Sequence, residues 1–289
     1  MRVSVSSTIA AAACLLSLAD ANTTPVSDKD MNDLLNEGGV SLAMKAAPMF
    51  FFGQAMNHPP CIPTFATDKS NKQTPPADLC DWPDAGCNCR TPGVPIGNPA
   101  PSFPVYYSYQ KCTDTSIRIQ YSLFYQKDGF NPAKVFGHHY FENLGSDWER
   151  VLVIWKKSDD GLWRPAEIKL SQHSGYQTLE WDQIQNTFND DTAGQKLGGP
   201  NGQKNLNHAK VYVAWAKHDH HNERNTGFND VLSQLTNNAF RSQDWWYLPQ
   251  RGDYIRADGG TEIGRLMRGM DWGDASSNPA SVHDGLCQA

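Results

Sequence analysis

The sequence predicts a mainly β fold of the α+β type: a single-domain central β-sandwich with peripheral helices and a disulfide-stapled N-terminal loop region. Three observations support this class. Short apolar or alternating runs bounded by turn residues occur at 117–124, 151–155, 167–170 and 210–215, and such runs are typical of strands. Helical periodicity is scarce, and no repeat or linker indicates a second domain. Several strands with few helices favour two packed sheets.

The first 21 residues are predicted to be a secretory signal peptide. Met1-Arg2 gives a weakly positive start, an apolar run covers residues 9–16, and small residues follow at Ala19 and Ala21. The apolar run is too short for a transmembrane helix, and no later stretch qualifies. We therefore expect residues 1–21 to be removed, residues 22–289 to form one domain, and the mature protein to be secreted and extracellular.

Cysteine content agrees with secretion. Cys14 lies in the signal segment, and six cysteines remain: Cys61, Cys80, Cys87, Cys89, Cys112 and Cys287. An even number in a secreted chain predicts up to three disulfides, with the pairing left open. The net charge of −6 argues against a nucleic-acid partner and against simple adsorption to anionic lipid.

Along the mature chain, the predicted elements follow in order. Residues 28–57 carry a helical pattern with an acidic start. Residues 58–104 are rich in Pro, Asp, Thr and Cys without lasting periodicity, which indicates a stapled loop region. Regular strands begin at Val105. The alternation at 117–124 predicts a half-buried strand, and a further helical stretch is expected at 261–267.

The strand at 151–155 is preceded by two carboxylates. Asp147 and Glu149 are two residues apart, so on a strand they point to the same face, whereas Trp148 points to the other. Adjacent carboxylates repel and are costly to desolvate, so they need a divalent cation, an Arg or Lys, or exposure at the strand end. A solvated strand entrance salt-bridged to Arg150 or Lys156 is the alternative interpretation.

Six of the nine histidines lie in loops or beside strand ends: His138, His139, His173, His218, His220 and His221. Loops from one sheet edge can converge, and carboxylates with imidazoles around a pocket suit a divalent cation. A polar hairpin loop is the alternative for residues 217–221.

An enzymatic interpretation rests on the same carboxylates. The sequence contains no nucleophile elbow, zinc-protease helix motif or phosphate-binding glycine loop. Asp147 and Glu149 could act as the acid and base of a retaining glycosidase, whose carboxyls lie about 5–5.5 Å apart. Residues 245–247, Trp-Trp-Tyr, are either a sugar-stacking or membrane-interface platform or part of the core, and aromatic runs are more often core.

Four segments resemble the necrosis- and ethylene-inducing-like proteins, which fungi, oomycetes and bacteria secrete. Residues 143–149, Asn-Leu-Gly-Ser-Asp-Trp-Glu, align with the family heptapeptide Gly-His-Arg-His-Asp-Trp-Glu, which an apolar strand follows. Residues 121–128 are similar to Tyr-Ser-Trp-Tyr-Phe-Pro-Lys-Asp, and residues 171–176 to Ser-x-His-Gly-Gly-Tyr. Residues 271–284 resemble the closing segment of the family. The resemblance spans roughly residues 100–289.

The resemblance implies a central β-sandwich flanked by helices, a divalent cation in an acidic cavity, and disruption of plant plasma membranes after contact with sphingolipid head groups. By position, Asp147 and Glu149 would be the metal ligands. The other cavity-lining residues would be Asp128, His138, His139, His173, His218, His220 and His221.

The chain departs from the family heptapeptide at its first four positions, of which three carry the chemistry of the motif. Leu144 and Ser146 replace the two motif histidines, and Gly145 replaces the arginine. Oxygen ligands would therefore dominate, which favours Mg²⁺ or Ca²⁺ over zinc. Fewer protein ligands also imply weaker binding and reduced toxicity.

Two functions remain open from the sequence. The first is a non-enzymatic, secreted necrosis-inducing-like effector, a cytolysin acting as a virulence toxin at plant plasma membranes. The second is a secreted carbohydrate-active enzyme or glycan-binding protein that uses Asp147 and Glu149 on the same scaffold. The expected partner is a plant membrane sphingolipid or a cell-surface glycan, and we expect a monomer without nucleic acid.

Overall fold

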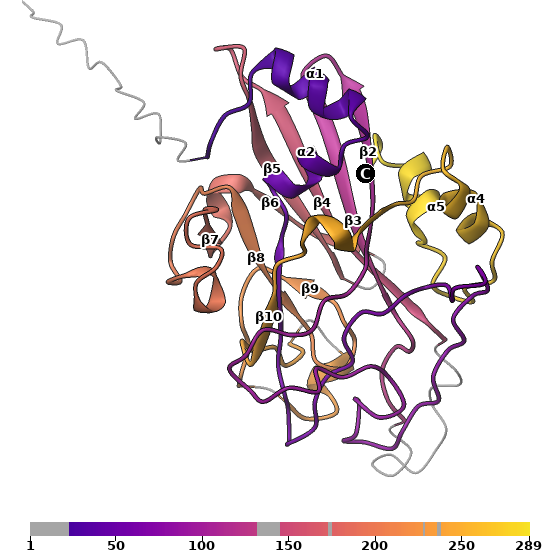
Figure 1. Cartoon of the computed structure of the whole chain (residues 1–289). Helices are drawn as coiled ribbons and strands as arrows, with labels where there is room; N and C mark the ends of the chain where they lie inside the picture. The colour runs from indigo at the N-terminus through magenta and orange to yellow at the C-terminus, as the bar shows by residue number, and fades with distance from the viewer. Residues whose placement is uncertain (1–22, 132–144, 173–174, 228, 236–237) are drawn as a thin grey trace, which may run out of the picture.

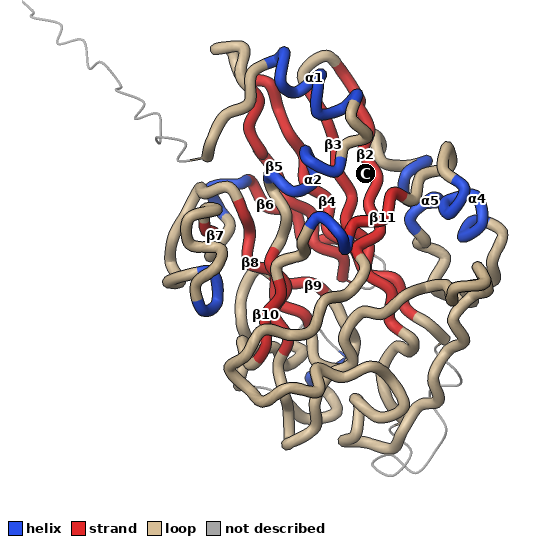
Figure 2. The backbone as a smooth tube through the Cα atoms, in the orientation of Figure 1, coloured by secondary structure: helices blue, strands red, loops and turns tan. Residues whose placement is uncertain are grey.

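A computed structural model describes residues 23–131, 145–172, 175–227, 229–235 and 238–289. The described chain is mainly β, with two sheets and short helices at the periphery (Figure 1). Loops make up much of the remainder and gather at one end of the molecule, as the tube in Figure 2 shows. The predicted fold class is confirmed.

The larger sheet has six strands in the order β11-β2-β3-β4-β5-β6. Their bounds are β2 Val105–Thr113, β3 Ser116–Tyr125, β4 Asp147–Lys157, β5 Trp163–Gln172, β6 Gly175–Glu180 and β11 Tyr254–Arg256. Neighbours pair antiparallel except β11 and β2, which are parallel. The strands predicted from 117–124, 151–155 and 167–170 are therefore adjacent in this sheet.

The smaller sheet has the order β10-β1-β8-β7, and β9 also pairs with β8. Its strands are β1 Met49–Phe52, β7 Thr187–Phe188, β8 His208–Val213, β9 His220–His221 and β10 Trp245–Tyr247. Strands β1 and β8 run parallel, whereas β10, β7 and β9 pair antiparallel with their neighbours.

The helices are short, and side-chain caps fix where several begin. They are α1 Asp28–Asn36, α2 Val40–Lys45, α4 Glu262–Arg268 and α5 Pro279–Asp284, with 3₁₀ turns η1 Trp181–Gln183, η2 Lys196–Gly198, η3 Ser233–Leu235 and η4 Arg251–Asp253. Ser27 caps α1, Thr261 caps α4 and Asn278 caps α5, each accepting a backbone N–H of the first turn. The helix predicted at 261–267 is confirmed. In the described chain, no helix is long and apolar enough to cross a membrane.

The main core joins the two sheets and the first two helices. Val151, Val153 and Trp155 of β4 are fully or almost fully buried and belong to one apolar cluster with Phe50 and Phe52 of β1. Met31 of α1 and Leu42 of α2 belong to the same cluster. Burial of these apolar side chains is the main force that holds the sheets together.

The helical interpretation of residues 28–57 is wrong in its second half. Helices α1 and α2 end by Lys45, and residues 49–52 form β1, a central strand with every residue buried. Four consecutive apolar residues, Met-Phe-Phe-Phe, carry no alternation because β1 is covered on both faces. Periodicity cannot distinguish such a strand from a buried helix.

The loop region at 58–104 is confirmed. This range is described throughout and contains no named helix or strand. Two disulfides, Cys61–Cys89 and Cys80–Cys87, hold it together. A third, Cys112–Cys287, joins β2 to the C-terminal segment.

The prediction that residues 117–124 are only half-buried is wrong. Gln120 and Ser122 of β3 are fully buried, and Ser108, Gln120 and Ser122 form a hydrogen-bonded chain across β2 and β3. The polar face of these strands is covered because α5 packs against β2 and β3. Alternation predicted a strand correctly but could not show that the C-terminal segment returns to cover its polar face.

Candidate functional site

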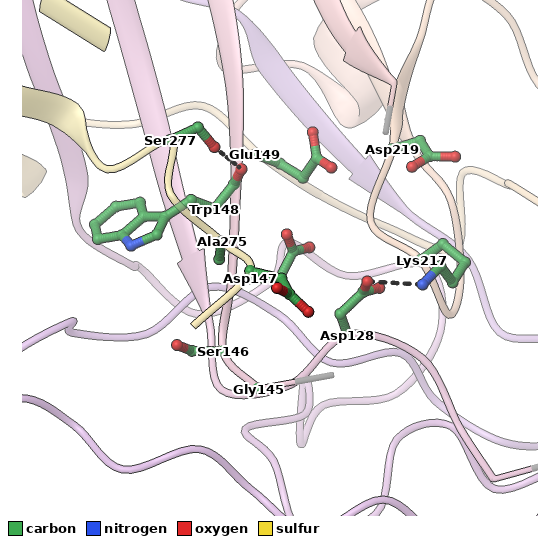
Figure 3. A pocket seen from close by; sticks show the side chains of 11 residues that line it. Asp128, Gly145, Ser146, Asp147, Trp148, Glu149, Lys217, Asp219, Ala275 and Ser277 are labelled. Carbon is green, nitrogen blue, oxygen red and sulfur yellow. Dashed lines mark hydrogen bonds and ion pairs between the residues drawn. The ribbon is translucent and has the colours of Figure 1, made fainter. Parts of the chain in front are cut away.

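Strand β4 presents the two carboxylates as its residue alternation requires. Asp147 pairs with Tyr125 and Glu149 with Leu123 of β3. Trp148 lies on the opposite face, where its indole ring packs against Tyr106, Phe124 and Trp272. In Figure 3 this ring points away from the carboxyl groups of Asp147 and Glu149.

The two carboxyls face a pocket at the start of β4, with a volume of about 180 Å³. Its lining residues are Asp128, Gly145, Ser146, Asp147, Trp148, Glu149, Lys217, Asp219, Asp274, Ala275 and Ser277. Five of these carry carboxyl groups and one carries an ammonium group. The pocket is therefore acidic, and loops after β3 and β8 complete it around the strand end.

Asp128 and Lys217 enter the pocket from different sheets. Asp128 follows β3, and Lys217 follows β8. The backbone N–H of Gly129 donates to the carbonyl of Ala216 at 3.0 Å, which holds the two loops together. The Lys217 Nζ donates to Asp128 Oδ2 at 2.7 Å (Figure 3).

His218 reaches Asp147 from the same loop as Lys217. Its Nδ1 lies 3.1 Å from Asp147 Oδ2, and its ring stacks on Tyr125. The residue has a φ of 60°, a left-handed conformation that is uncommon for a side chain with a Cβ. Burial lowers the pKa of His218 to about 3, so the imidazole is neutral at physiological pH.

Glu149 lies deeper than Asp147 and is 5% exposed. Its Oε2 accepts a hydrogen bond from the Ser171 hydroxyl of β5, and that hydroxyl in turn accepts from the Arg150 N–H at 2.8 Å. Burial, and then the charges of Asp147 and Asp219, raise the pKa of Glu149 well above its usual range. Ser171 therefore fixes the direction of a carboxyl that binds protons readily.

The pKa values of Asp147 and Asp128 shift in the same direction. Burial raises the pKa of Asp147, although the nearby Lys217 charge opposes the shift. Burial and the charge of Asp147 raise the pKa of Asp128. The ionised carboxylates of Asp128, Asp147 and Glu149 repel one another. A bound divalent cation would offset this repulsion with its own positive charge and would favour the ionised form of each carboxyl.

Three side chains bring potential ligand atoms together. One carboxylate oxygen each from Asp128 and Asp147 and one ring nitrogen of His218 all lie within 4.8 Å of one another. Two carboxylate oxygens fit a hard cation, and a neutral imidazole fits a transition metal equally well. The donor set therefore fits a divalent cation.

A second cluster of potential ligands, made of two cysteines and an aspartate, cannot bind a metal ion in the same way. Cys80, Asp84 and Cys87 also converge, but both sulfurs belong to the Cys80–Cys87 disulfide. A disulfide sulfur offers no thiolate to a metal.

The remaining predicted histidines lie elsewhere or outside the described chain. His138, His139 and His173 are outside the described residues. His220 and His221 form β9, are buried, and are not among the residues that line the pocket. The structure thus brings together Asp128, Asp147, Glu149 and His218 of the predicted set.

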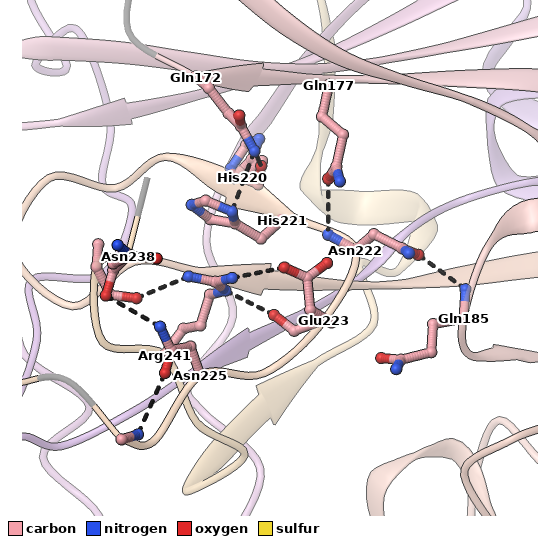
Figure 4. A network of polar contacts seen from close by, with 12 residues as sticks. Gln172, Gln177, Gln185, His220, His221, Asn222, Glu223, Asn225, Asn238 and Arg241 are labelled. Carbon is pink, nitrogen blue, oxygen red and sulfur yellow. Dashed lines mark hydrogen bonds and ion pairs between the residues drawn. The ribbon is translucent and has the colours of Figure 1, made fainter. Parts of the chain in front are cut away.

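A polar network holds strand β9 and the segment that follows it (Figure 4). The Nε2 of Gln172 donates to the carbonyl of His220 at 3.1 Å and lies 3.0 Å from Nδ1 of His221. Downstream, Arg241 donates to the backbone carbonyl and the carboxylate of Glu223, each at 2.6 Å. These contacts hold the chain directly after the loop that carries Lys217 and Asp219.

Sequence reasoning missed three charged residues of the pocket. Lys217 and Asp219 flank His218 in the loop after β8, and Asp274 lies in the C-terminal segment. A signal for the first two was present, because charged residues alternate with histidines directly after an apolar strand.

The proposed sugar-stacking platform is part of the core. Trp245 and Trp246 are 3% and 7% exposed, and their strand pairs with β1. The indole Nε1 of Trp245 donates to the carbonyl of Val94 at 2.9 Å. Neither ring can stack on a sugar, so the glycosidase alternative loses this support.

Fold and site together define a mainly β, disulfide-bonded protein with an acidic pocket at the end of a central strand. No family model and no curated protein sequence matches the chain. Solved structures do align with it. NLPPya in complex with mannosamine has 16% identity and a TM-score of 0.47, covering 86% of this chain and 88% of that chain.

Two further alignments are of the same kind. A structure described as "Toxin fold as basis for microbial attack and plant defense" has 13% identity and a TM-score of 0.45, covering 92% of this chain and 93% of that chain. The non-toxic HaNLP3 protein has 16% identity and a TM-score of 0.42, covering 88% and 86%. These are necrosis- and ethylene-inducing-like proteins, the family that the sequence resembles.

Proposed function

We propose that the pocket at the start of β4 binds a divalent cation, Mg²⁺ or Ca²⁺. The observation that carries this proposal is the convergence of Asp128, Asp147 and His218 atoms within 4.8 Å. Asp128, Asp147 and His218 would hold the ion, and Glu149 would bind it directly or through water. When bound, the cation supplies positive charge and open coordination positions for ligand oxygens.

At the level of the whole protein, we propose a secreted necrosis-inducing-like effector, a cytolysin acting at plant plasma membranes. The predicted signal peptide at 1–21, the single domain at 22–289 and the heptapeptide-like segment at 143–149 support it. Three disulfides suit an extracellular protein. The loss of both motif histidines would weaken this activity relative to motif-complete relatives.

The chemistry of the pocket favours a neutral or cationic head group over an anionic one. Asp128, Asp147, Glu149, Asp219 and Asp274 concentrate carboxyls in a small volume. A bound cation leaves coordination sites that hydroxyl groups can fill, whereas uncompensated carboxylates repel phosphate. The proposed partner is therefore a hydroxyl-rich sphingolipid head group or a cell-surface glycan.

A leakage assay tests the proposed function. Dye release would be measured from plant protoplasts and from vesicles with and without glycosylated plant sphingolipid, using the wild type and Asp147→Asn. We expect leakage that requires sphingolipid, calcium or magnesium, and Asp147. Release of reducing sugar from plant glycans without leakage would contradict the proposal and restore the enzymatic alternative.

A further inference from the structure

The pocket contains a cation of its own. Lys217 Nζ lies 2.7 Å from Asp128 Oδ2, and the side chains of the two residues are only 10% and 23% exposed. An ammonium group this close to a carboxylate in a partly buried site attracts it far more strongly than at an exposed surface. Asp128 is also one of the three residues that converge as potential ligands.

The position of Lys217 is built into the backbone. The Gly129 N–H bond to the Ala216 carbonyl places the two loops side by side, at 3.0 Å. Gly129 has a φ of +89°, and a Cβ there would lie 3.5 Å from Cδ and 3.6 Å from Nζ of Lys217. The lysine side chain therefore extends over a residue without a side chain and is directed at Asp128.

We infer that Lys217 is the internal counter-ion of the acidic pocket and competes with a divalent cation for Asp128, thereby setting the cation affinity of the site. The inference rests on the cation site of the proposed function. Asp128 Oδ1 is buried without a hydrogen-bond partner among the described residues, so an ion coordinated there would share one carboxylate with the ammonium group on Oδ2, and the two cations would repel each other. Lys217 thus keeps the pocket folded without metal and weakens metal binding when metal is present.

Removal of the lysine charge tests this inference. Isothermal titration with MgCl₂ and with CaCl₂ would compare the wild type, Lys217→Gln and the control Lys157→Gln. Lys157 forms an ion pair with Asp28 at 3.0 Å, at the far end of β4 from Asp147, so the control makes the same charge change away from the pocket. We expect Lys217→Gln to bind cations at least about tenfold more tightly, which corresponds to about 1.4 kcal/mol, and Lys157→Gln to match the wild type.

Three further measurements separate competition from a general effect on folding. In EDTA, Lys217→Gln should melt below the wild type, because the carboxyls lose their counter-ion, and added cation should restore its melting temperature. The double variant Lys217→Gln with Asp128→Asn should lose the gain in affinity, since Asp128 is the group for which the two cations compete. Lys217→Arg should keep the wild-type affinity.

The possible outcomes distinguish this inference from the proposed function. Equal affinity in wild type and Lys217→Gln overturns the role of Lys217 and leaves the cation site in place. Cation binding by Lys217→Gln but not by the wild type supports the role of Lys217 and shows that the wild-type pocket holds no divalent ion. No binding by either protein overturns both.

Discussion

The imidazole of His218 lies parallel to the phenol ring of Tyr125, with the ring centroids 3.9 Å apart and the planes 4° from parallel. Tyr125 is the last residue of β3 and pairs with Asp147 of β4, so one strand end supports both partners of the His218–Asp147 contact. The stacking fixes the plane of the imidazole before any ligand binds. Preorganised ligands bind a cation at lower entropic cost.

We expect Trp148→Ala to affect folding more than pocket chemistry. The ring is 2% exposed and packs between Tyr106, Phe124 and Trp272, so its loss should cost about 3–5 kcal/mol of unfolding free energy. Urea denaturation would measure this cost. Phe65→Ala, at a side chain 56% exposed, is the control and should change stability by less than about 0.5 kcal/mol. A Trp148→Ala protein with unchanged stability and lost leakage would show that Trp148 acts in function.

Asp147→Asn should abolish the response to divalent cations. A cation that binds only the folded state adds about 2.7 kcal/mol to the free energy of unfolding at a hundredfold excess over Kd. The variant lacks one of the converging carboxylates, so it should lose this stabilisation. Thermal shift with Mg²⁺, Ca²⁺ and EDTA would compare the variant with wild type. Asp114→Asn, at a fully exposed side chain in the β2–β3 turn, should respond as the wild type does. A wild-type melting temperature that neither EDTA nor cations change would refute the cation site.

Cation affinity should rise with pH. Burial raises the pKa of Asp128, Asp147 and Glu149, so protons compete with the cation for these carboxyls as the pH falls. His218, whose pKa burial lowers to about 3, stays neutral and contributes no such dependence above that pH. Titration of Mg²⁺ at a pH of about 5.5 and of about 8 would show the difference, and buffers of different ionisation enthalpy would count the released protons. Equal affinity at both values would contradict the assignment of the carboxyls as ligands.

Secreted, mature protein should contain no free thiol. All six cysteines of residues 22–289 form the three disulfides, and Cys14 lies in the predicted signal peptide. Thiol titration of denatured, unreduced protein should therefore find none. Two or more free thiols per chain would refute the pairing.

The strands that alternate or end at turn residues were predictable from the sequence, and others were not. β4 was predicted with the correct faces because Asp147, Trp148 and Glu149 alternate around the strand before a β-branched run. β1 was not, since a strand buried on both faces shows no alternation. β10 was missed for the same reason, because Trp245 and Trp246 are both buried.

Local alternation predicted the pair Asp147 and Glu149, whereas His218 and Asp128 were expected at the site from the clustered histidines and the family resemblance. Asp147 and Glu149 share a face because they are two apart on one strand. The contact between Asp128 and Lys217 joins the ends of strands from two different sheets, 89 positions apart. Such a contact depends on how the sheets pack, and local patterns contain no information about it.

The disulfide between Cys112 and Cys287 has a consequence for how the molecule opens. It anchors the last residues to β2, and Arg118 Nη1 donates to the carbonyl of Leu286 at 2.9 Å beside it. A protease that cut the segment between α4 and α5 would leave α5 tethered over β2 and β3. The effective concentration of a tethered segment is on the order of millimolar, so α5 would re-dock after each local opening. Extracellular proteases could thus nick this protein without exposing the buried Ser108–Gln120–Ser122 chain beneath α5.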